Sequence, residues 1–198
     1  EKLVVVVTHN DELANRYEAI IKQFIDEKIV LDIFNKKSDS NEVKVGITLY
    51  QGLPKYDKMD FIVQKAVEIG AKTIVPVIME RTIVKVDDIS GKKKVDRWQK
   101  IAEEAAKQSY RQIIPNVENI VNLENVIENL SKYDIVIVPY ECEKNAIIKN
   151  TLKNIKENVE SIAVVIGPEG GLSKNEISYL DSIGFKRLSL GKHLHLHI

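Results

Sequence analysis

Residues 166–177, with the sequence IGPEGGLSKNEI, have the residue types best suited to hold a small molecule. The glycines and the proline stop a preceding apolar run and allow backbone conformations closed to other residues. Ser173 and Glu176 have the capping-box spacing that begins a helix. A strand, a glycine-rich turn and a helix N-terminus can bind a polar or anionic ligand through backbone amides. The segment lacks the usual nucleotide-binding signatures, and an ordinary tight connection remains the alternative.

The composition limits the class of protein. The chain has 198 residues, enough for one large domain or for one domain and a small one. Its 29 Lys and Arg balance 29 Asp and Glu, so no overall basicity indicates a nucleic-acid partner. A single cysteine, Cys142, excludes an internal disulfide and favours a cytoplasmic location. No membrane span or signal peptide is visible, and the opening strand-like LVVVV predicts further residues upstream.

The first part of the chain is expected to be a small β module. Three runs, at residues 3–8, 17–24 and 29–34, have the composition of strands separated by polar turns. Imperfect alternation in the middle run allows a short helix there. A polar stretch follows at residues 36–42, and we predict a boundary between a module of residues 1–44 and a domain of residues 45–198.

From residue 45 onward, strands alternate with helices. Strands are predicted at residues 45–50, 73–79, 117–121, 134–139, 163–167 and 187–190. Helices are predicted from Asp57 to near Gly70 and at residues 96–111, 123–130, 144–155 and 176–183. This order predicts an α/β fold, a mostly parallel sheet with helices on both faces. Ligands bind such sheets at the carboxyl ends of the strands, where residues 139–142, the glycine loop and residues 190–192 are expected to meet.

A local excess of positive charge marks the predicted helix at residues 96–111. Between residues 85 and 111 there are eight basic and five acidic residues. The expected apolar face contains Trp98, and Arg97, Lys100, Lys107 and Arg111 are expected on the opposite face. Such a face is either an RNA-binding surface or an ordinary solvated surface.

Four motifs stand in order between residues 55 and 191. The first is KxDKMDFIVQKAVEIG at residues 55–70, and the second combines Arg97-Trp98, Glu104-Ala105 and QSxR at residues 108–111, where x is any residue. The third is IGPEGGL at residues 166–172, and SLG at residues 189–191 begins the fourth. Together they resemble the motifs of the bacterial 16S rRNA uridine-N3 methyltransferases, which implies membership of the SPOUT superfamily, α/β methyltransferases with a trefoil knot. The β module resembles the later part of that family's PUA-like RNA-binding domain.

The resemblance also implies a cofactor and partners. The cofactor is S-adenosylmethionine, and the partners are the 16S rRNA of the small ribosomal subunit and a second copy of the chain. The implied cofactor contacts are Tyr140, Glu141, Ile166, Gly167, Pro168, Glu169, Gly170, Gly171, Leu190 and Gly191. The RNA contacts that we predict are Lys55, Lys65, Arg81, Arg97, Lys100, Lys107, Gln108 and Arg111.

The end of the chain departs from the family pattern. After residue 192 the family continues with a basic, threonine-rich and acidic motif and a final helix that closes the knot, whereas this chain reads HLHLHI. We therefore expect an incomplete C-terminal part of the domain. The alternating histidines could share one face of a strand and suit a metal, but we expect a cloning remnant or a misread segment and no metal site.

The implied reaction sets requirements on the site. Methyl transfer to N3 of a uridine needs the methyl group in line with N3, the base out of its stack and the imide proton removed. Arg111 is the first candidate to stabilise the uracil anion and Arg81 the second. Glu169 could assist proton removal or hydrogen-bond backbone amides. The alternatives are methylation of another RNA, a non-catalytic RNA-binding protein, and Cys142 as a nucleophile without an evident triad.

Overall fold

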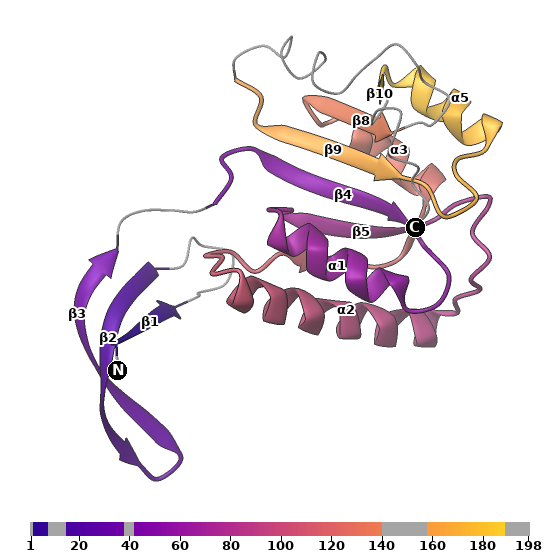
Figure 1. Cartoon of the computed structure of the whole chain (residues 1–198). Helices are drawn as coiled ribbons and strands as arrows, with labels where there is room; N and C mark the ends of the chain where they lie inside the picture. Colours follow the sequence, from indigo (N-terminus) through magenta and orange to yellow (C-terminus); the bar gives the residue numbers. More distant parts are fainter. Residues whose placement is uncertain (1, 8–14, 38–41, 140–157, 189–198) are drawn as a thin grey trace.

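The computed structural model describes residues 2–7, 15–37, 42–139 and 158–188, which form two separate sheets (Figure 1). One is a three-stranded antiparallel sheet, and the other is a seven-stranded parallel sheet. Several predictions fall outside the described residues: Tyr140, Glu141, Cys142, Leu190, Gly191, the helix at 144–155 and the histidine-containing end. Among the described residues, no helix has both the length and the apolar character needed to span a membrane.

The N-terminal sheet consists of β1 (Lys2–Val7), β2 (Asn15–Ile25) and β3 (Lys28–Lys37) in that order. The middle run is one strand, so the short helix allowed by its imperfect alternation is wrong. Two register shifts in the β2–β3 pairing account for that imperfection, because each shift changes which side chains share a face. Figure 1 shows that the β2–β3 hairpin extends away from the parallel sheet.

The parallel sheet has the order β10-β8-β9-β4-β5-β6, and β7 also pairs with β5. Its strands are β4 (Gly46–Gly52), β5 (Thr73–Ile78), β6 (Asn116–Val117), β7 (Val121–Asn122), β8 (Ile135–Pro139), β9 (Ser161–Ile166) and β10 (Lys186–Leu188). Each pairing is parallel, which confirms the predicted α/β fold. The predicted strand at 117–121 is wrong in detail, because β6 and β7 are two short pieces that pair with different parts of β5.

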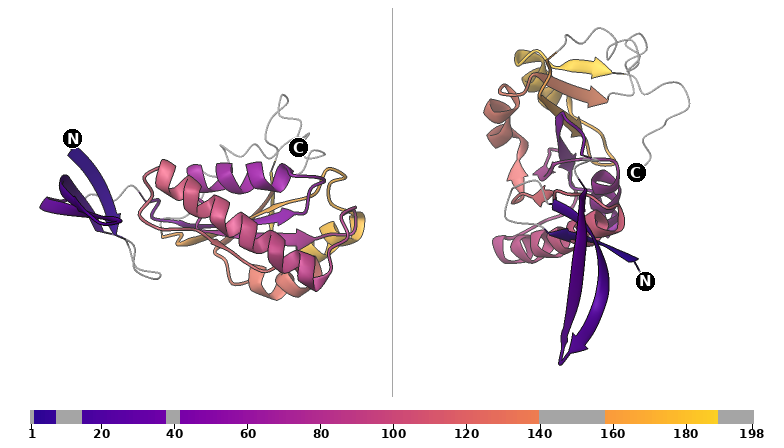
Figure 2. Two further views of the ribbon diagram at one scale, coloured as in Figure 1. Left: turned by 90° about the horizontal axis from the view of Figure 1, so that it is seen from below. Right: turned by 90° about the vertical axis from the view of Figure 1, so that its left-hand side faces the viewer.

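Helices cover both faces of the parallel sheet, as predicted (Figure 2). On one face lie α1 (Lys58–Glu68) and α2 (Asp88–Gln108), and on the other lie α3 (Leu123–Leu130) and α5 (Lys174–Ser182). The predicted core face of α1 is confirmed, because Met59, Val63, Ala66 and Val67 are buried. The predicted start of α2 is wrong by more than two turns. Asp87 and Ser90 form a capping box at the start of the helix. The lysine-rich turn that follows interrupts the apolar periodicity, so the sequence pattern does not reveal this start.

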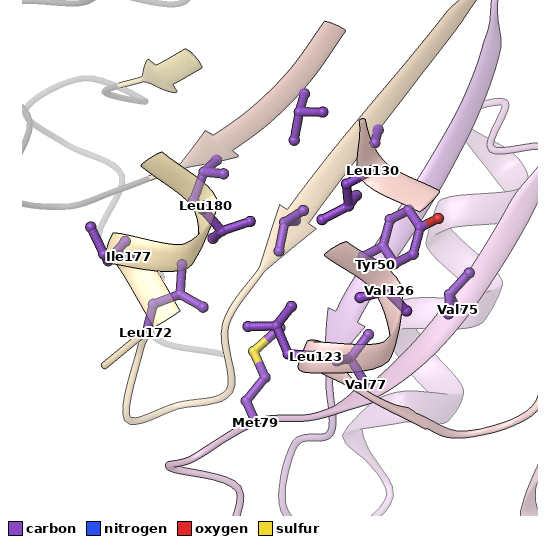
Figure 3. Packing of buried hydrophobic residues seen from close by; sticks show 14 residues of the cluster. Tyr50, Val75, Val77, Met79, Leu123, Val126, Leu130, Leu172, Ile177 and Leu180 are labelled. Atoms are coloured by element: carbon purple, nitrogen blue, oxygen red, sulfur yellow. The ribbon is translucent and has the colours of Figure 1, made fainter. Parts of the chain in front are cut away.

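The apolar core is divided by the sheet into two layers. Tyr50, Val75 and Val77 project toward α3 and α5, where Leu123, Leu130 and Leu180 cover them (Figure 3). The opposite layer packs under α1 and α2, around side chains such as Leu49, Ile74 and Trp98. Both faces of β4 and β5 are therefore buried, as expected of central parallel strands. Because helices cover the faces, a ligand-binding site can form only at the strand ends.

Candidate functional site

The glycine loop, residues 167–171, lies between β9 and α5 at the carboxyl edge of the sheet. It packs closely on β4, since a Cβ on Gly52 would lie 2.6 Å from the backbone nitrogen of Pro168. The predicted capping box at the start of α5 is confirmed. Ser173 Oγ accepts a hydrogen bond from the Glu176 amide (3.2 Å), and the Glu176 carboxylate accepts one from the Ser173 amide (2.7 Å). The Glu176 carboxylate also accepts a hydrogen bond from the Glu80 amide, and this bond joins the start of α5 to the segment that follows β5.

Glu169 holds the loop on one side. Its Oε1 accepts hydrogen bonds from the backbone amide of Lys55 (3.0 Å) and from Lys58 Nζ (3.2 Å). Burial alone acts to raise the pKa of Glu169, but hydrogen bonds from backbone amides and from Lys58 outweigh it and hold the pKa below its usual range. A carboxylate with a lowered pKa is a weak proton acceptor. The geometry therefore supports the alternative role, bonding to backbone amides, over proton removal.

Arg81 holds the loop on the other side, where its Nη1 donates to the carbonyl oxygen of Gly170 at 2.6 Å. At Gly171 the loop is left-handed, with φ +67°, and the Gly171 amide donates to Pro168 O at 2.8 Å. A Cβ placed on Gly171 would meet no described atom within 4 Å. The loop is therefore braced on both sides, and among the described atoms the side of Gly171 is left open.

Arg111 is not on the exposed face of α2, and its predicted placement there is wrong. The helix ends at Gln108, and the Arg111 side chain is only 9% exposed. Its Nη2 lies 2.7 Å from a carboxylate oxygen of Glu42, and its Nη1 donates to Val67 O at 3.2 Å. Nη1 also donates to Ala71 O. These partners precede β4 and β5, so Arg111 lies at the amino edge of the sheet, opposite the glycine loop.

A groove of about 700 Å³ brings together three predicted RNA contacts, Arg97, Lys100 and Gln108. Its other lining residues include acidic side chains from both helices, namely Asp60, Asp96 and Glu104. Asp60 accepts the indole N–H of Trp98 at 3.1 Å and also binds Arg97. The groove is consequently polar and mixed in charge rather than uniformly basic.

The remaining predicted RNA contacts do not share one surface. Lys55 and Arg81 lie beside the glycine loop, in contact with Glu169 and Gly170 respectively. Two other lysines make local helical ion pairs, Lys65 with Glu68 (2.7 Å) and Lys107 with Glu104 (2.8 Å). The hydrogen bond and charge of Glu104 raise the pKa of Lys107. Exposed pairs of this kind contribute little to stability.

Three features of the site were missed from sequence. Gly52 gives no local signal of its contact with Pro168, because that contact joins two strands far apart in the chain. Glu42 lies in a polar stretch whose composition predicts only a domain boundary, yet it binds Arg111. Tyr56 has φ +57°, and the preceding Gly52-Leu53-Pro54 is a turn signal that predicts an irregular connection at this point. Within the described parts of the chain, no cluster of His, Cys, Asp and Glu is arranged to bind a metal ion.

Known proteins with similar sequences identify the family of this chain. The RNA methyltransferase domain family matches residues 41–194, and the chain belongs to that family. Among its relatives is the ribosomal RNA small subunit methyltransferase E of Bacillus subtilis, 33% identical over 162 residues. That alignment covers 78% of this chain but only 61% of the relative's length. The corresponding protein of Aquifex aeolicus is 39% identical over 150 residues, with 73% of this chain and 59% of that protein covered.

Solved structures agree with this assignment. A ribosomal RNA small subunit methyltransferase E from Neisseria gonorrhoeae, bound to S-adenosylmethionine, has a TM-score of 0.80 and 28% identity. The comparison covers 98% of this chain and 77% of that chain. A putative methyltransferase from Legionella pneumophila, also with this cofactor bound, has a TM-score of 0.80 and 27% identity over 98% of this chain and 76% of its own.

Proposed function

We propose that this chain transfers a methyl group from S-adenosylmethionine to N3 of a uridine in the 16S rRNA of the small ribosomal subunit. The observation that carries the proposal is the glycine loop, which is braced by Glu169 and Arg81 and has open space at Gly171. The relatives are ribosomal RNA small subunit methyltransferases, and this supports a ribosomal RNA substrate. Bound S-adenosylmethionine in two structural neighbours supports the cofactor.

The residues present fit the cofactor. Residues 166–171 lie at the carboxyl edge of β9, where parallel sheets bind their ligands. Glu169 and Arg81 fix the loop before the ligand arrives, which lowers the ordering cost of binding. The family resemblance assigns four further cofactor contacts, Tyr140, Glu141, Leu190 and Gly191, which lie outside the described residues. When bound, S-adenosylmethionine supplies an electrophilic methyl group, and the protein supplies position and electrostatics.

For N3 to accept the methyl group, its imide proton must pass to water, and the uracil ring then carries the negative charge. Negative charge that develops on the uracil oxygens needs a cation beside the glycine loop. We assign this role to Arg81 rather than Arg111. A guanidinium has five N–H donors, and the bond to Gly170 uses one of them. Arg111, at the opposite edge, braces the fold.

The RNA would lie along the groove between α1 and α2 and reach the glycine loop at the carboxyl edge. Arg97, Lys100 and Gln108 line this path, and Lys55 and Arg81 stand at its end. The proposal further includes a PUA-like role for the N-terminal sheet, a trefoil knot, a homodimer and a cytoplasmic location. The resemblance of the four sequence motifs to the 16S rRNA uridine-N3 methyltransferases supports these parts of the proposal.

Isothermal titration with S-adenosylmethionine tests the proposal. Gly171→Ala should abolish binding, because its Cβ would occupy the open space beside the loop. Gly184→Ala is the matched control: Gly184 has φ +71° and equally open surroundings, but it follows α5, away from the loop. Gly170 is less suitable, since a Cβ there would crowd the Arg81 side chain at 3.2 Å.

Both variants carry the same backbone strain, about 1–2 kcal/mol, so a difference between them reports on the ligand. Equal affinities for the cofactor would show that the pocket lies elsewhere. If the parent chain binds RNA but not S-adenosylmethionine, the protein is a non-catalytic RNA-binding protein and the proposed function is wrong.

A further inference from the structure

Tyr56 combines unusual exposure with an unusual backbone conformation. It lies in the turn between β4 and α1, and at 87% exposed it is the most exposed large apolar or aromatic side chain that the structure describes. Its φ of +57° falls in the left-handed region, which side chains disfavour and glycine adopts readily. A ring held there adds nothing to the core, so packing does not account for it.

The neighbours of Tyr56 connect the two parts of the proposed site. On one side, the amide of Lys55 donates to Glu169 of the glycine loop at 3.0 Å. On the other side, Asp57 Oδ1 lies 3.8 Å from Arg97 Nη1, and Arg97 lines the groove between α1 and α2. Tyr56 therefore stands between the groove and the loop, where the proposed RNA path meets the proposed cofactor.

We propose that Tyr56 is a stacking platform for an unpaired RNA base at the entrance to the glycine loop. A base that leaves its stack loses stacking energy, and an exposed aromatic ring replaces part of that loss. Lys55 is the chain neighbour of Tyr56, and Lys58 and Arg81 contact the glycine loop, so positive charge suited to the adjoining phosphates lies close by. The inference rests on the proposed function, because it takes RNA to be the ligand.

Photocrosslinking tests the contact directly. A single-stranded RNA pentanucleotide with 5-iodouridine at its centre is irradiated with the full chain, and mass spectrometry identifies the modified residue. We expect crosslinking at Tyr56, retained in Tyr56→Phe and lost in Tyr56→Gly. Tyr110→Gly is the matched control, because Tyr110 also has φ +56° and is 59% exposed but follows α2, away from the loop.

Affinity for the same oligonucleotide supplies the second measurement. Tyr56→Gly should weaken binding by about fivefold to a hundredfold, the range for loss of one stacked base. The salt dependence should stay the same, because no phosphate contact is removed. Tyr56→Phe and Tyr110→Gly should bind within about twofold of the parent. The melting temperature of Tyr56→Gly should not fall, because glycine suits the left-handed turn.

Several outcomes overturn the inference: no binding of the oligonucleotide by the parent, equal losses in Tyr56→Gly and Tyr110→Gly, or crosslinking elsewhere with unchanged affinity in Tyr56→Gly. Methyl transfer to small-subunit particles separates this failure from failure of the proposed function. If the parent transfers methyl and Tyr56→Gly does so with the same KM for particles, only the stacking role is wrong. A parent that neither binds the cofactor nor transfers methyl contradicts the proposed function itself.

Discussion

Glu42 and Glu169 bind the same kinds of partner at opposite edges of the parallel sheet. Each carboxylate accepts hydrogen bonds from backbone amides and pairs with one cationic side chain. The cation is Arg111 for Glu42 and Lys58 for Glu169. The difference is burial: both side chains of the Glu42 pair are 9% exposed, whereas Lys58 is 43% and Glu169 23% exposed. A buried pair fixes the fold, because breaking it leaves a charge in a poorly solvated place. A partly solvated pair can position a loop with little effect on stability.

The largest expected effect is that of Arg111→Met on stability. The substitution removes the cation beside the buried Glu42 carboxylate and the hydrogen bonds to Val67 O and Ala71 O. We expect the free energy of unfolding, measured by urea denaturation at pH 7, to fall by about 3–5 kcal/mol. The double variant with Glu42→Gln should lose less than the sum of the single losses, because the two side chains interact directly.

The same variant separates a structural role for Arg111 from a catalytic one. Folded Arg111→Met should bind S-adenosylmethionine as the parent does and transfer methyl at the same single-turnover rate. A stable variant with a greatly reduced rate would restore Arg111 as a catalytic residue and contradict the comparison of the two edges.

A smaller effect is expected from pH. Burial acts to raise the pKa of Glu42, but Arg111 and the amides of Gln112 and Ile113 outweigh it and hold the pKa below the ordinary 4.5. The pair's contribution to stability is therefore fully present above about pH 4.5 and is lost as the pH falls through the lower, folded-state pKa. Urea unfolding between pH 7 and pH 3 should show a shallower loss of stability in Glu42→Gln than in the parent. Parallel curves would mean that the Glu42 pKa is not lowered by folding.

The two edges also differ in how far the sequence predicts them. The strand, the glycine turn and the Ser173–Glu176 capping box were predicted because each depends on residues close together in the chain. The position of Arg111 could not be predicted in this way. Its side chain turns inward to meet Glu42, 69 residues away, and the helical period continued past the real end of α2. For the same reason, the sequence does not favour Arg81 over Arg111 as the cation that stabilises the uracil anion. Its contact with Gly170 joins residues that are 89 positions apart in the chain.

The smallest expected stability effects are those of Glu169→Gln and Lys58→Met, and they sharpen the comparison most. Both side chains are partly solvated, so each substitution should change the free energy of unfolding by about 1 kcal/mol or less. Glu169→Gln keeps an acceptor for the Lys55 amide but loses the charge, and Lys58→Met removes only the cation.

If the carboxylate only positions the loop, both variants should weaken cofactor binding by a similar factor, less than about tenfold. The methyl-transfer rate at saturating cofactor and RNA should then stay unchanged. If Glu169 removes the N3 proton, Glu169→Gln alone should slow that rate by about 10²–10⁴-fold, whereas Lys58→Met should not. Single-turnover transfer of labelled methyl to small-subunit particles distinguishes the two roles, because the lowered pKa of Glu169 is compatible with holding the loop and poorly suited to accepting a proton.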